Sequence, residues 1–221
     1  DDCGKTGRAQ FGRAHSSLLK YDFAFLPPDI RMVDSPTLRT KRLILRPITL
    51  DDVEALHEMF SDPETMRFWD RPPTRDVEET VTRLNWSLSA DAEWHRMYAL
   101  VRREDRRMVG IVNYFARQPW NQRLEIGYML HRSVWRTGLM TEALIPFLDY
   151  CFDGLQSHRI EATIEPDNAA SRGIAQSLGF VCEGGPMRDR LRNGDSYRSL
   201  MMYGLLEPDW RKRRAGAETT G

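Results

Sequence analysis

A strand, a turn and a helix start meet around one glycine, and this combination suits the binding of an anion. Residues 125–130 have a strand-like apolar pattern, and a helical apolar stripe begins at Gly138. The first N–H groups of a helix have no partner within it, and the helix dipole makes that end positive. Gly138 lets a ligand approach the backbone closely, and Arg136 offers a charge-assisted contact to phosphate. We therefore expect an anion site at this turn.

Other features of the sequence argue against several other kinds of site. It contains no Gly-x-x-x-x-Gly-Lys-Ser/Thr run, which argues against a common nucleotidase. Cys3, Cys151 and Cys182 form no Cys-x-x-Cys pair and no His/Cys cluster at zinc spacing, so no metal is expected. The 32 basic and 32 acidic residues cancel, which gives no bulk attraction to nucleic acid or to an anionic membrane.

No apolar run approaches the roughly 18–20 residues needed to span a bilayer, and no secretory leader is evident. The odd, unpatterned cysteine count favours a reducing compartment. The sequence therefore predicts a cytoplasmic protein.

The elements around the turn predict a mixed sheet with helices on both faces. Apolar periodicity and turn residues indicate strands at 38–48, 97–101, 107–116, 123–130, 158–165, 180–190 and 196–206, and helices from 49, at 76–94, 138–152 and 168–178. The first strands read as an antiparallel meander, and Asn193-Gly194 is a strong turn signal for the closing hairpin. We expect an α+β fold with a mostly antiparallel, seven-stranded sheet.

The composition divides the chain into three parts. Residues 37–210 are expected to form one domain, and residues 211–221 a disordered tail. Residues 1–36 differ in composition from the rest of the chain, and Met32 sits just before the expected domain start. We interpret 1–36 as an N-terminal extension. It is either an added or translated upstream segment, or a real arm whose aromatic segment docks on the body or on a partner chain.

Five short segments in a fixed order carry a further signal. They are residues 38–47, the Glu-Ile-Gly-Tyr strand at 125–128, Trp135-x-x-Gly-Leu-Met-Thr-Glu-Ala at 135–143, Asn168-x-x-Ser171, and Leu178-Gly179-Phe180 followed by Glu183-Gly184. Each segment alone is weak, but together they resemble the GNAT superfamily of acyl-CoA N-acyltransferases. The closer resemblance is to the ribosomal-protein alanine N-acetyltransferase branch. It extends from about Leu38 to Trp210.

This resemblance implies that acetyl-CoA is the cosubstrate. The family's pyrophosphate loop corresponds to the backbone amides of Arg136, Thr137, Gly138, Leu139, Met140 and Thr141. Many members have Gly in place of Arg136 and a small residue in place of Met140, which changes the loop's shape and not its amides. The family's strand at 123–130 carries a β-bulge and splays from its parallel neighbour, here 158–165. Acetyl-CoA lies in that opening, where an N–H near Leu130 faces the thioester oxygen.

The resemblance also implies roles for side chains. Glu125 corresponds to a strand glutamate that serves some members as general base, and Asp189 is the weaker alternative. Otherwise Glu125 is a strand carboxylate held by neighbouring Arg side chains. Many members supply a Tyr to the leaving thiolate where this chain has Ala175, so Ser171 is the natural substitute. Asn168 either binds the pantetheine arm or caps the helix.

The predicted reaction is acetyl transfer to a primary amine, with a protein N-terminal amine as one acceptor class. Some ribosomal-protein acetyltransferases have a glutamate in the final hairpin where this chain has Arg190. The first alternative is a small-molecule amine such as a polyamine, amino acid or antibiotic. The second is a non-catalytic acyl-CoA-binding module. The oligomeric state stays open between monomer and homodimer.

Overall fold

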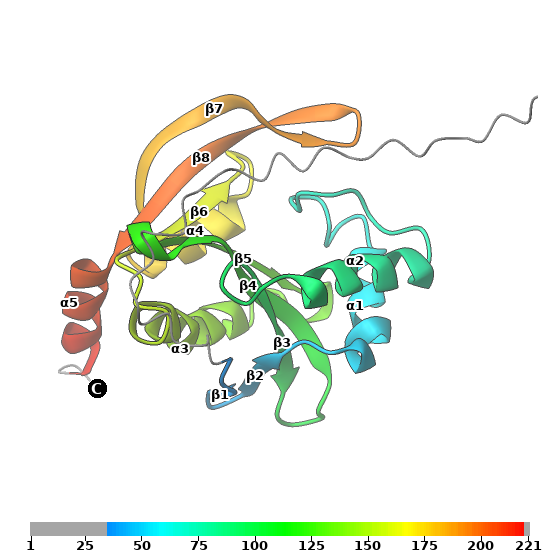
Figure 1. Cartoon of the computed structure of the whole chain (residues 1–221), viewed down its shortest axis with the longest axis horizontal. Helices are drawn as coiled ribbons and strands as arrows, with labels where there is room; N and C mark the ends of the chain where they lie inside the picture. The colour runs from blue at the N-terminus through cyan, green and yellow to red at the C-terminus, as the bar shows by residue number, and fades with distance from the viewer. Residues whose placement is uncertain (1–34, 219–221) are drawn as a thin grey trace, which may run out of the picture. The chain divides into compact units, whose positions relative to one another are not determined.

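The computed structural model describes residues 35–218, and the first 34 residues of the predicted extension (1–36) lie outside them. The described residues form eight strands and five helices (Figure 1). In chain order these are β1 (Leu38–Arg39), β2 (Leu43–Pro47), α1 (Val53–Phe60), α2 (Val77–Ser89), β3 (Arg96–Arg102), β4 (Met108–Gln118), β5 (Arg123–Leu130), α3 (Leu139–Asp153), β6 (Arg159–Ile164), α4 (Ala169–Ser177), β7 (Val181–Asn193), β8 (Ser196–Leu206) and α5 (Glu207–Glu218).

All eight strands belong to one sheet in the order β1-β2-β3-β4-β5-β6-β8-β7. Every neighbouring pair is antiparallel except β5 and β6. This parallel pair is hydrogen-bonded only from Arg123–Glu125 to Arg159–Glu161. Beyond that point β5 and β6 continue without pairing to each other. The prediction of a mostly antiparallel sheet with a splayed parallel pair is therefore confirmed.

The prediction of seven strands is wrong by one. The expected strand at 38–48 is a hairpin of two short strands, in which Leu38 pairs with Leu45. The backbone reverses at Thr40, whose N–H donates to Leu43 O (2.9 Å) and whose Oγ1 accepts from Leu43 N (2.8 Å). The Thr40 hydroxyl takes the place of a hydrogen bond between strands. The chain can therefore turn here although the apolar alternation of its sequence continues.

The β-bulge lies in β4, and not in the neighbouring β5 as the resemblance predicts. Phe115 pairs with Glu125 and Gln118 pairs with Arg123, so β4 has one residue more than β5 over this stretch. Ala116, between the two pairs, has a φ of 49°. From Glu125 onward β5 pairs with β4 without interruption. The bulge re-aims the strand beside Glu125, where β5 also parts from β6.

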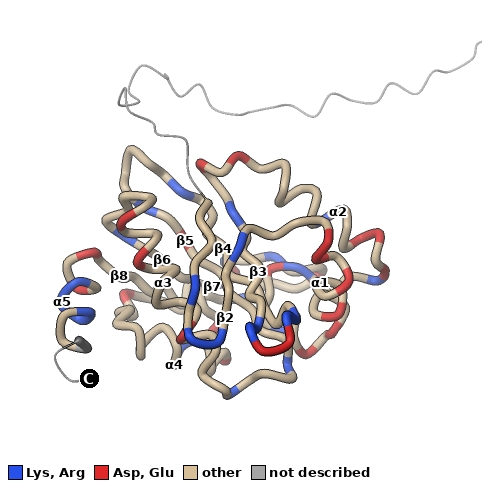
Figure 2. Tube along the Cα trace, turned by 90° about the horizontal axis from the view of Figure 1, so that it is seen from below, with Lys and Arg blue, Asp and Glu red and all other residues tan. Residues whose placement is uncertain are grey.

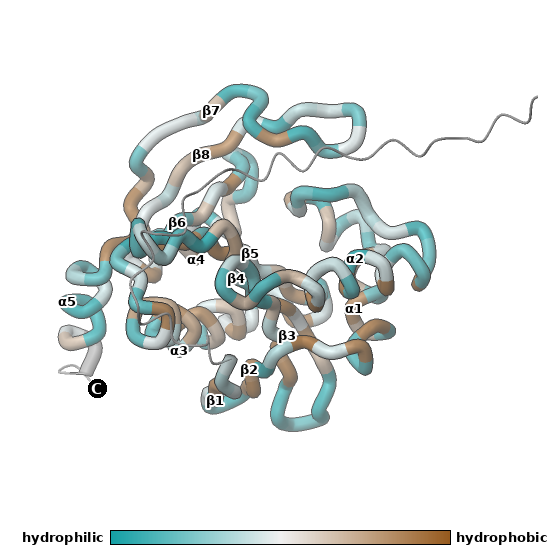
Figure 3. The backbone as a smooth tube through the Cα atoms, viewed as in Figure 1, coloured by the Kyte–Doolittle hydropathy of each residue, from teal (hydrophilic) through white to brown (hydrophobic). Residues whose placement is uncertain are grey.

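The sheet has a hydrophobic core on each face. One core contains α3 with residues such as Ile126 and Ile160, and the other contains α1 and α2 with residues such as Ile111 and Met129. Figure 3 shows hydrophobic residues along α3 and the central strands, and mostly hydrophilic ones along the β7–β8 hairpin. Successive strand side chains point to opposite faces. Glu125 therefore shares the α1–α2 face with Met129.

The predicted disordered tail (211–221) is wrong for residues 211–218, which belong to α5. Trp210 is 1% exposed, stacks on Phe152, and donates from Nε1 to Asp149 Oδ1 (2.8 Å). Arg211 forms ion pairs with Asp153 and with Glu207. Arg211 thus ties α5 to the C-terminal end of α3.

Candidate functional site

The turn between β5 and α3 presents a row of free backbone N–H groups. None of the amides of residues 136–141 donates a hydrogen bond within the described part of the chain. Arg136 and Gly138 have positive φ values of 61° and 77°, which turn the chain sharply into the first turn of α3. Six donors at a helix N-terminus form a cradle that suits an anion. We call residues 136–141 the cradle.

Glu142, in the first turn of α3, fixes the cradle to the β1–β2 turn. Its carboxylate accepts from Thr40 Oγ1 (2.5 Å) and from the N (2.7 Å) and Nε (2.6 Å) of Arg42. Arg42 also donates from Nη1 to the carbonyl of Thr137 (3.0 Å). Burial alone would raise the pKa of Glu142, but these hydrogen bonds outweigh it and hold the pKa below its usual range. The carboxylate therefore stays ionised and the cradle is held from behind.

A cavity of about 600 Å³ adjoins the cradle and is predominantly basic. It is lined by Lys41, Arg42, Arg102, Arg103, Glu104, Ser133, Val134, Thr137 and Leu139. Figure 2 shows the basic turn before β2 beside the mixed-charge turn between β3 and β4. Arg42 is paired with Glu142 and Arg102 with Asp105. The excess of positive charge on this side of the cradle favours a polyanion.

The edge of β5 beyond its pairing with β6 offers unpaired main-chain groups. His131 N donates to Val109 O (2.9 Å), which fixes the alternation of the β4–β5 ladder. Odd-numbered residues of β5 therefore direct their N–H and C=O groups toward β4. Ile126, Tyr128 and Leu130 direct theirs toward the gap. This edge can pair with an extended amide-containing chain.

On the α1–α2 face, the two neighbouring carboxylates Glu125 and Glu161 have different partners. Glu161 is 6% exposed and is held by Arg123 and by Arg159 (2.7 Å). Glu125 is half-buried and accepts from the hydroxyl of Thr163, with no arginine contact among the described residues. Because Glu161 takes the guanidinium contacts, Glu125 is left as the freer carboxylate.

The surroundings of Glu125 make it a stronger base. Burial raises the pKa of Glu125, and the negative charge of Glu161 raises it further. The hydrogen bond from Thr163 and the positive charge of Arg190 act in the opposite direction without cancelling the effect. A carboxylate with a raised pKa accepts a proton more readily near neutral pH. Asp189, the other candidate base, is exposed in the irregular part of β7, and its own φ is 50°.

Ser171, on α4, is joined across the gap to β5. Its Oγ lies 2.8 Å from the hydroxyl of Tyr128, which also lies 3.2 Å from the Ser171 carbonyl. Burial raises the pKa of Tyr128 to about 12, although the contact with Ser171 lowers it. Asn168 caps α4, because its Oδ1 accepts from Ser171 N (3.1 Å). Of the two roles predicted for Asn168, helix capping is the one the geometry displays.

The β7–β8 hairpin reaches the segment between α1 and α2, which covers the face that carries Glu125 (Figure 1). Asn193 Nδ2 donates to Trp69 O (2.8 Å). Arg198 Nη1 donates to Arg67 O (2.6 Å) and to Glu165 Oε1 (2.6 Å). These contacts join the hairpin to the segment between α1 and α2 and to Glu165, just after β6.

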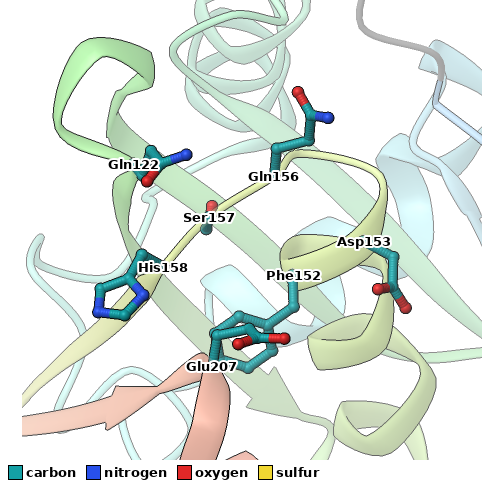
Figure 4. A pocket seen from close by; sticks show the side chains of 7 residues that line it. All are labelled: Gln122, Phe152, Asp153, Gln156, Ser157, His158 and Glu207. Carbon is teal, nitrogen blue, oxygen red and sulfur yellow. The ribbon is translucent and has the colours of Figure 1, made fainter. Parts of the chain in front are cut away.

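A smaller depression of about 310 Å³ lies at the other end of the parallel pair and does not belong to the site (Figure 4). Gln122 and His158 in its wall precede β5 and β6, whereas the cradle comes after the C-terminal end of β5. Its acidic side chains, Asp153 and Glu207, are paired with Arg211. Within residues 35–218, no His, Cys, Asp and Glu side chains gather in a group that could hold a metal ion. No helix there is long and apolar enough to cross a membrane.

The predicted site residues thus fall into three groups around one gap. The cradle and Leu130 lie at its C-terminal end, Glu125 lies where the two strands part, and Asn168 and Ser171 lie at the start of α4, where Ser171 contacts Tyr128. Sequence reasoning missed Asn113, whose side chain lies on the same face as Glu125, and the contact of Tyr128 with Ser171. The sequence does contain a signal for Asn113. It is the one amide side chain in the apolar run of β4 before the bulge.

Comparison with known proteins agrees with this geometry. A family model described as an acetyltransferase (GNAT) domain matches residues 42–181. The uncharacterized N-acetyltransferase p20 of Bacillus licheniformis is 33% identical over 177 residues, covering 79% of this chain and 98% of that protein. Spermidine N(1)-acetyltransferase of Escherichia coli (strain K12) is 23% identical over 158 residues, covering 72% and 83% of the two chains.

A solved structure is similar as well. RimL, a ribosomal L7/L12 alpha-N-protein acetyltransferase in complex with coenzyme A, superposes with a TM-score of 0.68 at 24% identity. It covers 77% of this chain and 98% of its own. The family model spans more than half of the sequence, and the element order and the splayed pair agree with it. The chain therefore belongs to the GNAT family of acyl-CoA-dependent N-acetyltransferases.

Proposed function

We propose that this protein transfers an acetyl group from acetyl-CoA to a primary amine, and that the acceptor is the N-terminal amine of a protein or peptide. The gap between β5 and β6 carries the proposal. Free amides at 136–141 lie at one end of it, unpaired main-chain groups line one edge, and Glu125 lies where the strands part. A diphosphate joined to an extended amide chain that ends in a thioester matches these three features in order.

The cradle fits a pyrophosphate because its donors are backbone N–H groups with no other partner among the described residues. Arg136 adds charge without being required for the shape. The amide-bearing arm would pair with the edge formed by Ile126 and Tyr128. The thioester oxygen would then meet the N–H of Leu130.

In the reaction, the amine nitrogen attacks the thioester carbonyl carbon, and a C–N bond forms while charge collects on the oxygen. The N–H of Leu130 stabilises that charge. Glu125 takes a proton from the nitrogen. The C–S bond then breaks with its electron pair on sulphur, and the hydroxyl of Ser171 donates a hydrogen bond to the thiolate. The proton held by Glu125 reaches the sulphur through solvent, which leaves CoA and the N-acetylated amine.

The acceptor assignment rests on the charge beside Glu125. An α-amine has a reference pKa near ~8, so roughly a tenth is neutral at pH 7, whereas a lysine amine near ~10.4 needs far more help. Arg190 acts on Glu125 electrostatically, and none of the ion pairs among the described residues includes Arg190. An unpaired cation there repels polycations such as spermidine, which the name of the E. coli relative gives as the acceptor of that protein. The charge therefore supports a peptide as the acceptor of this chain.

The test combines binding with turnover. Thermal shift with acetyl-CoA reports cosubstrate binding, and release of free thiol reports transfer to a panel of peptides with free N-termini, spermidine and free amino acids. We expect stabilisation by acetyl-CoA and the fastest thiol release with peptides. Faster turnover of spermidine or of amino acids would show that the acceptor is a small-molecule amine and not a peptide N-terminus. Stabilisation without turnover on any amine would identify a binding module and overturn the proposed reaction.

A further inference from the structure

Asn113 of β4 carries a buried oxygen with no hydrogen-bond partner. The residue is 6% exposed, and its Oδ1 is without a partner among the described residues. Most buried side-chain polar atoms in folded proteins are paired, because leaving one unpaired costs free energy. A buried, unpaired carbonyl oxygen in a core strand is therefore available to a donor on a bound substrate.

The position of Asn113 places this oxygen beside the proposed base. Asn113 pairs with Gly127 of β5, and Phe115, two residues further along β4, pairs with Glu125. Side chains two apart on a strand share a face, so Asn113 lies on the same face as Glu125, one step closer to the thioester end of β5. The intervening residue of β5 on this face is Gly127, which has no side chain to stand between them.

Gly127 preserves this arrangement. A Cβ atom at position 127 would lie 2.7 Å from Asn113 Oδ1, closer than such atoms come in real structures. The absence of a side chain leaves the asparagine oxygen lying over the strand. The glycine thus leaves room for the asparagine oxygen over β5, on the face that carries Glu125, where a Cβ would also lie 3.6 Å from the Phe115 ring.

The other buried unpaired atoms are hydroxyl oxygens or arginine Nε atoms, at Ser35, Arg96, Tyr98, Arg117 and Arg123. Arg117 and Arg123 lack a partner at Nε but hold Glu93 and Glu161 through Nη1. The hydroxyl of Tyr98 belongs to an aromatic cluster with Phe147 and Tyr150 on the α3 face. Among the described residues, Asn113 alone offers an unpaired amide oxygen on the α1–α2 face.

We propose that Asn113 Oδ1 accepts a hydrogen bond from the acceptor amine and thereby selects primary over secondary amines, an inference that rests on the proposed acetyl transfer. A primary amine has one carbon substituent, two N–H groups and one lone pair. One N–H donates to Glu125 and the other to Asn113, which points the lone pair at the thioester carbon. A secondary amine has one N–H and cannot satisfy both acceptors. Asn113 cannot take the proton, so it is a positioning residue that contacts substrate, and Glu125 remains the base.

The test compares an alanine-initiated peptide with the same peptide bearing N-methylalanine, in the wild-type enzyme and in Asn113→Leu. Wild-type enzyme should prefer the primary amine in kcat/KM. In Asn113→Leu, kcat/KM for the primary amine should fall on the order of 10- to 100-fold, the range for one hydrogen bond to a group that becomes charged. The N-methyl peptide should change little, so the preference shrinks. The KM for acetyl-CoA should stay constant.

Two companion variants separate positioning from folding. Asn113→Asp retains an acceptor oxygen and should retain the preference, while Asn121→Leu, an exposed asparagine in the β4–β5 turn, should change nothing. The thermal midpoint of Asn113→Leu should equal or exceed that of the wild type, because an unpaired buried oxygen is removed. Wild-type turnover with an unchanged preference in Asn113→Leu overturns this inference alone. Wild-type enzyme that acetylates no amine overturns the proposed function and this inference together.

Discussion

The cradle and the face that carries Glu125 lie at opposite ends of one gap and are built in different ways. The cradle presents backbone N–H groups at 136–141, and its side chains range from exposed (Arg136, Thr137) to buried (Leu139, Met140). The Glu125 face presents side chains, with Asn113 and Glu161 buried and the hydroxyl of Thr163 donating a hydrogen bond to the Glu125 carboxylate. The donors of the cradle are set by the backbone conformation. The acceptors of the Glu125 face are set by the identity and position of individual side chains.

This difference indicates where each half of the reaction can vary. Backbone donors tolerate substitutions such as Met140 and Arg136, so a family can keep one cosubstrate while its loop residues change. Side-chain acceptors change with single substitutions, so the amine can differ among relatives of the same fold. Fold likeness alone therefore supports the cosubstrate more strongly than it supports the acceptor.

The largest expected effect is at the base. Glu125→Gln keeps the shape and the contact with Thr163 but cannot take a proton. We expect kcat/KM for the amine to fall about 10²- to 10⁴-fold, the usual contribution of a positioned general base. Because burial raises the pKa of Glu125, the wild-type pH–rate profile should have an acidic limb above the reference Glu pKa near ~4.3, and this limb should disappear in the variant.

The same variant sharpens the contrast between the two ends. Affinity for CoA, measured by calorimetry, should be unchanged in Glu125→Gln. The control Glu54→Gln, on the exposed side of α1, should change neither the CoA affinity nor kcat/KM for the amine. Full activity in Glu125→Gln would show that another group is the general base. Asp189 would then be the first residue to substitute.

The next largest effect is at the leaving group. Ser171→Ala should lower kcat roughly 10- to 100-fold, the effect of losing one hydrogen bond to a developing charge. Tyr128→Phe removes the hydroxyl that lies 2.8 Å from Ser171 Oγ. If that hydroxyl acts through Ser171, the double variant will be no slower than Ser171→Ala in steady-state assays. Effects that multiply instead would show that Tyr128 acts independently.

The sequence predicts β5 to the residue, because Arg123 and Leu130 bound a clear apolar alternation. It predicts the position of the cradle because a glycine just before a helical apolar stripe can be recognised in the sequence. It does not predict the hairpin at Thr40, where an unbroken apolar pattern hides a turn. The family resemblance places the bulge one strand away, since a bulge depends on pairing between strands.

The acceptor face is harder to predict for a physical reason. Whether Glu125 or Glu161 holds the arginines depends on register between β5 and β6, which are separated in sequence by α3. The unpaired oxygen of Asn113 appears only when Gly127 is placed opposite it. The tail at 211–218 is helical because α3 supplies acidic partners to its arginines.

A smaller effect is expected at the cradle itself. Gly138 has a φ of 77°, where a side chain costs roughly 1–2 kcal/mol. Gly138→Ala should therefore weaken CoA binding about 5- to 30-fold in calorimetry, with the kcat at saturating acetyl-CoA nearly unchanged. Gly173→Ala on α4 is the matched control, because a Cβ there meets nothing within 4 Å. Equal CoA affinity in the two alanine variants would contradict the backbone cradle.

The smallest effect is on stability, and its sign tests the electrostatics of the Glu125 face. Burial and the charge of Glu161 raise the pKa of Glu125 in the folded protein above its unfolded value. A group with a raised folded pKa stabilises the fold fully below the unfolded pKa, and that contribution is lost as pH rises through the folded pKa. At pH 7 the ionised carboxylate therefore weakens the fold, and Glu125→Gln should raise the thermal midpoint there. At pH 3, below both values, the difference between Gln and the protonated acid should vanish. A lower midpoint for Glu125→Gln at pH 7 would mean that Thr163 and Arg190 stabilise the carboxylate more than burial opposes it, and the site would then hold a weaker base than the proposed reaction needs.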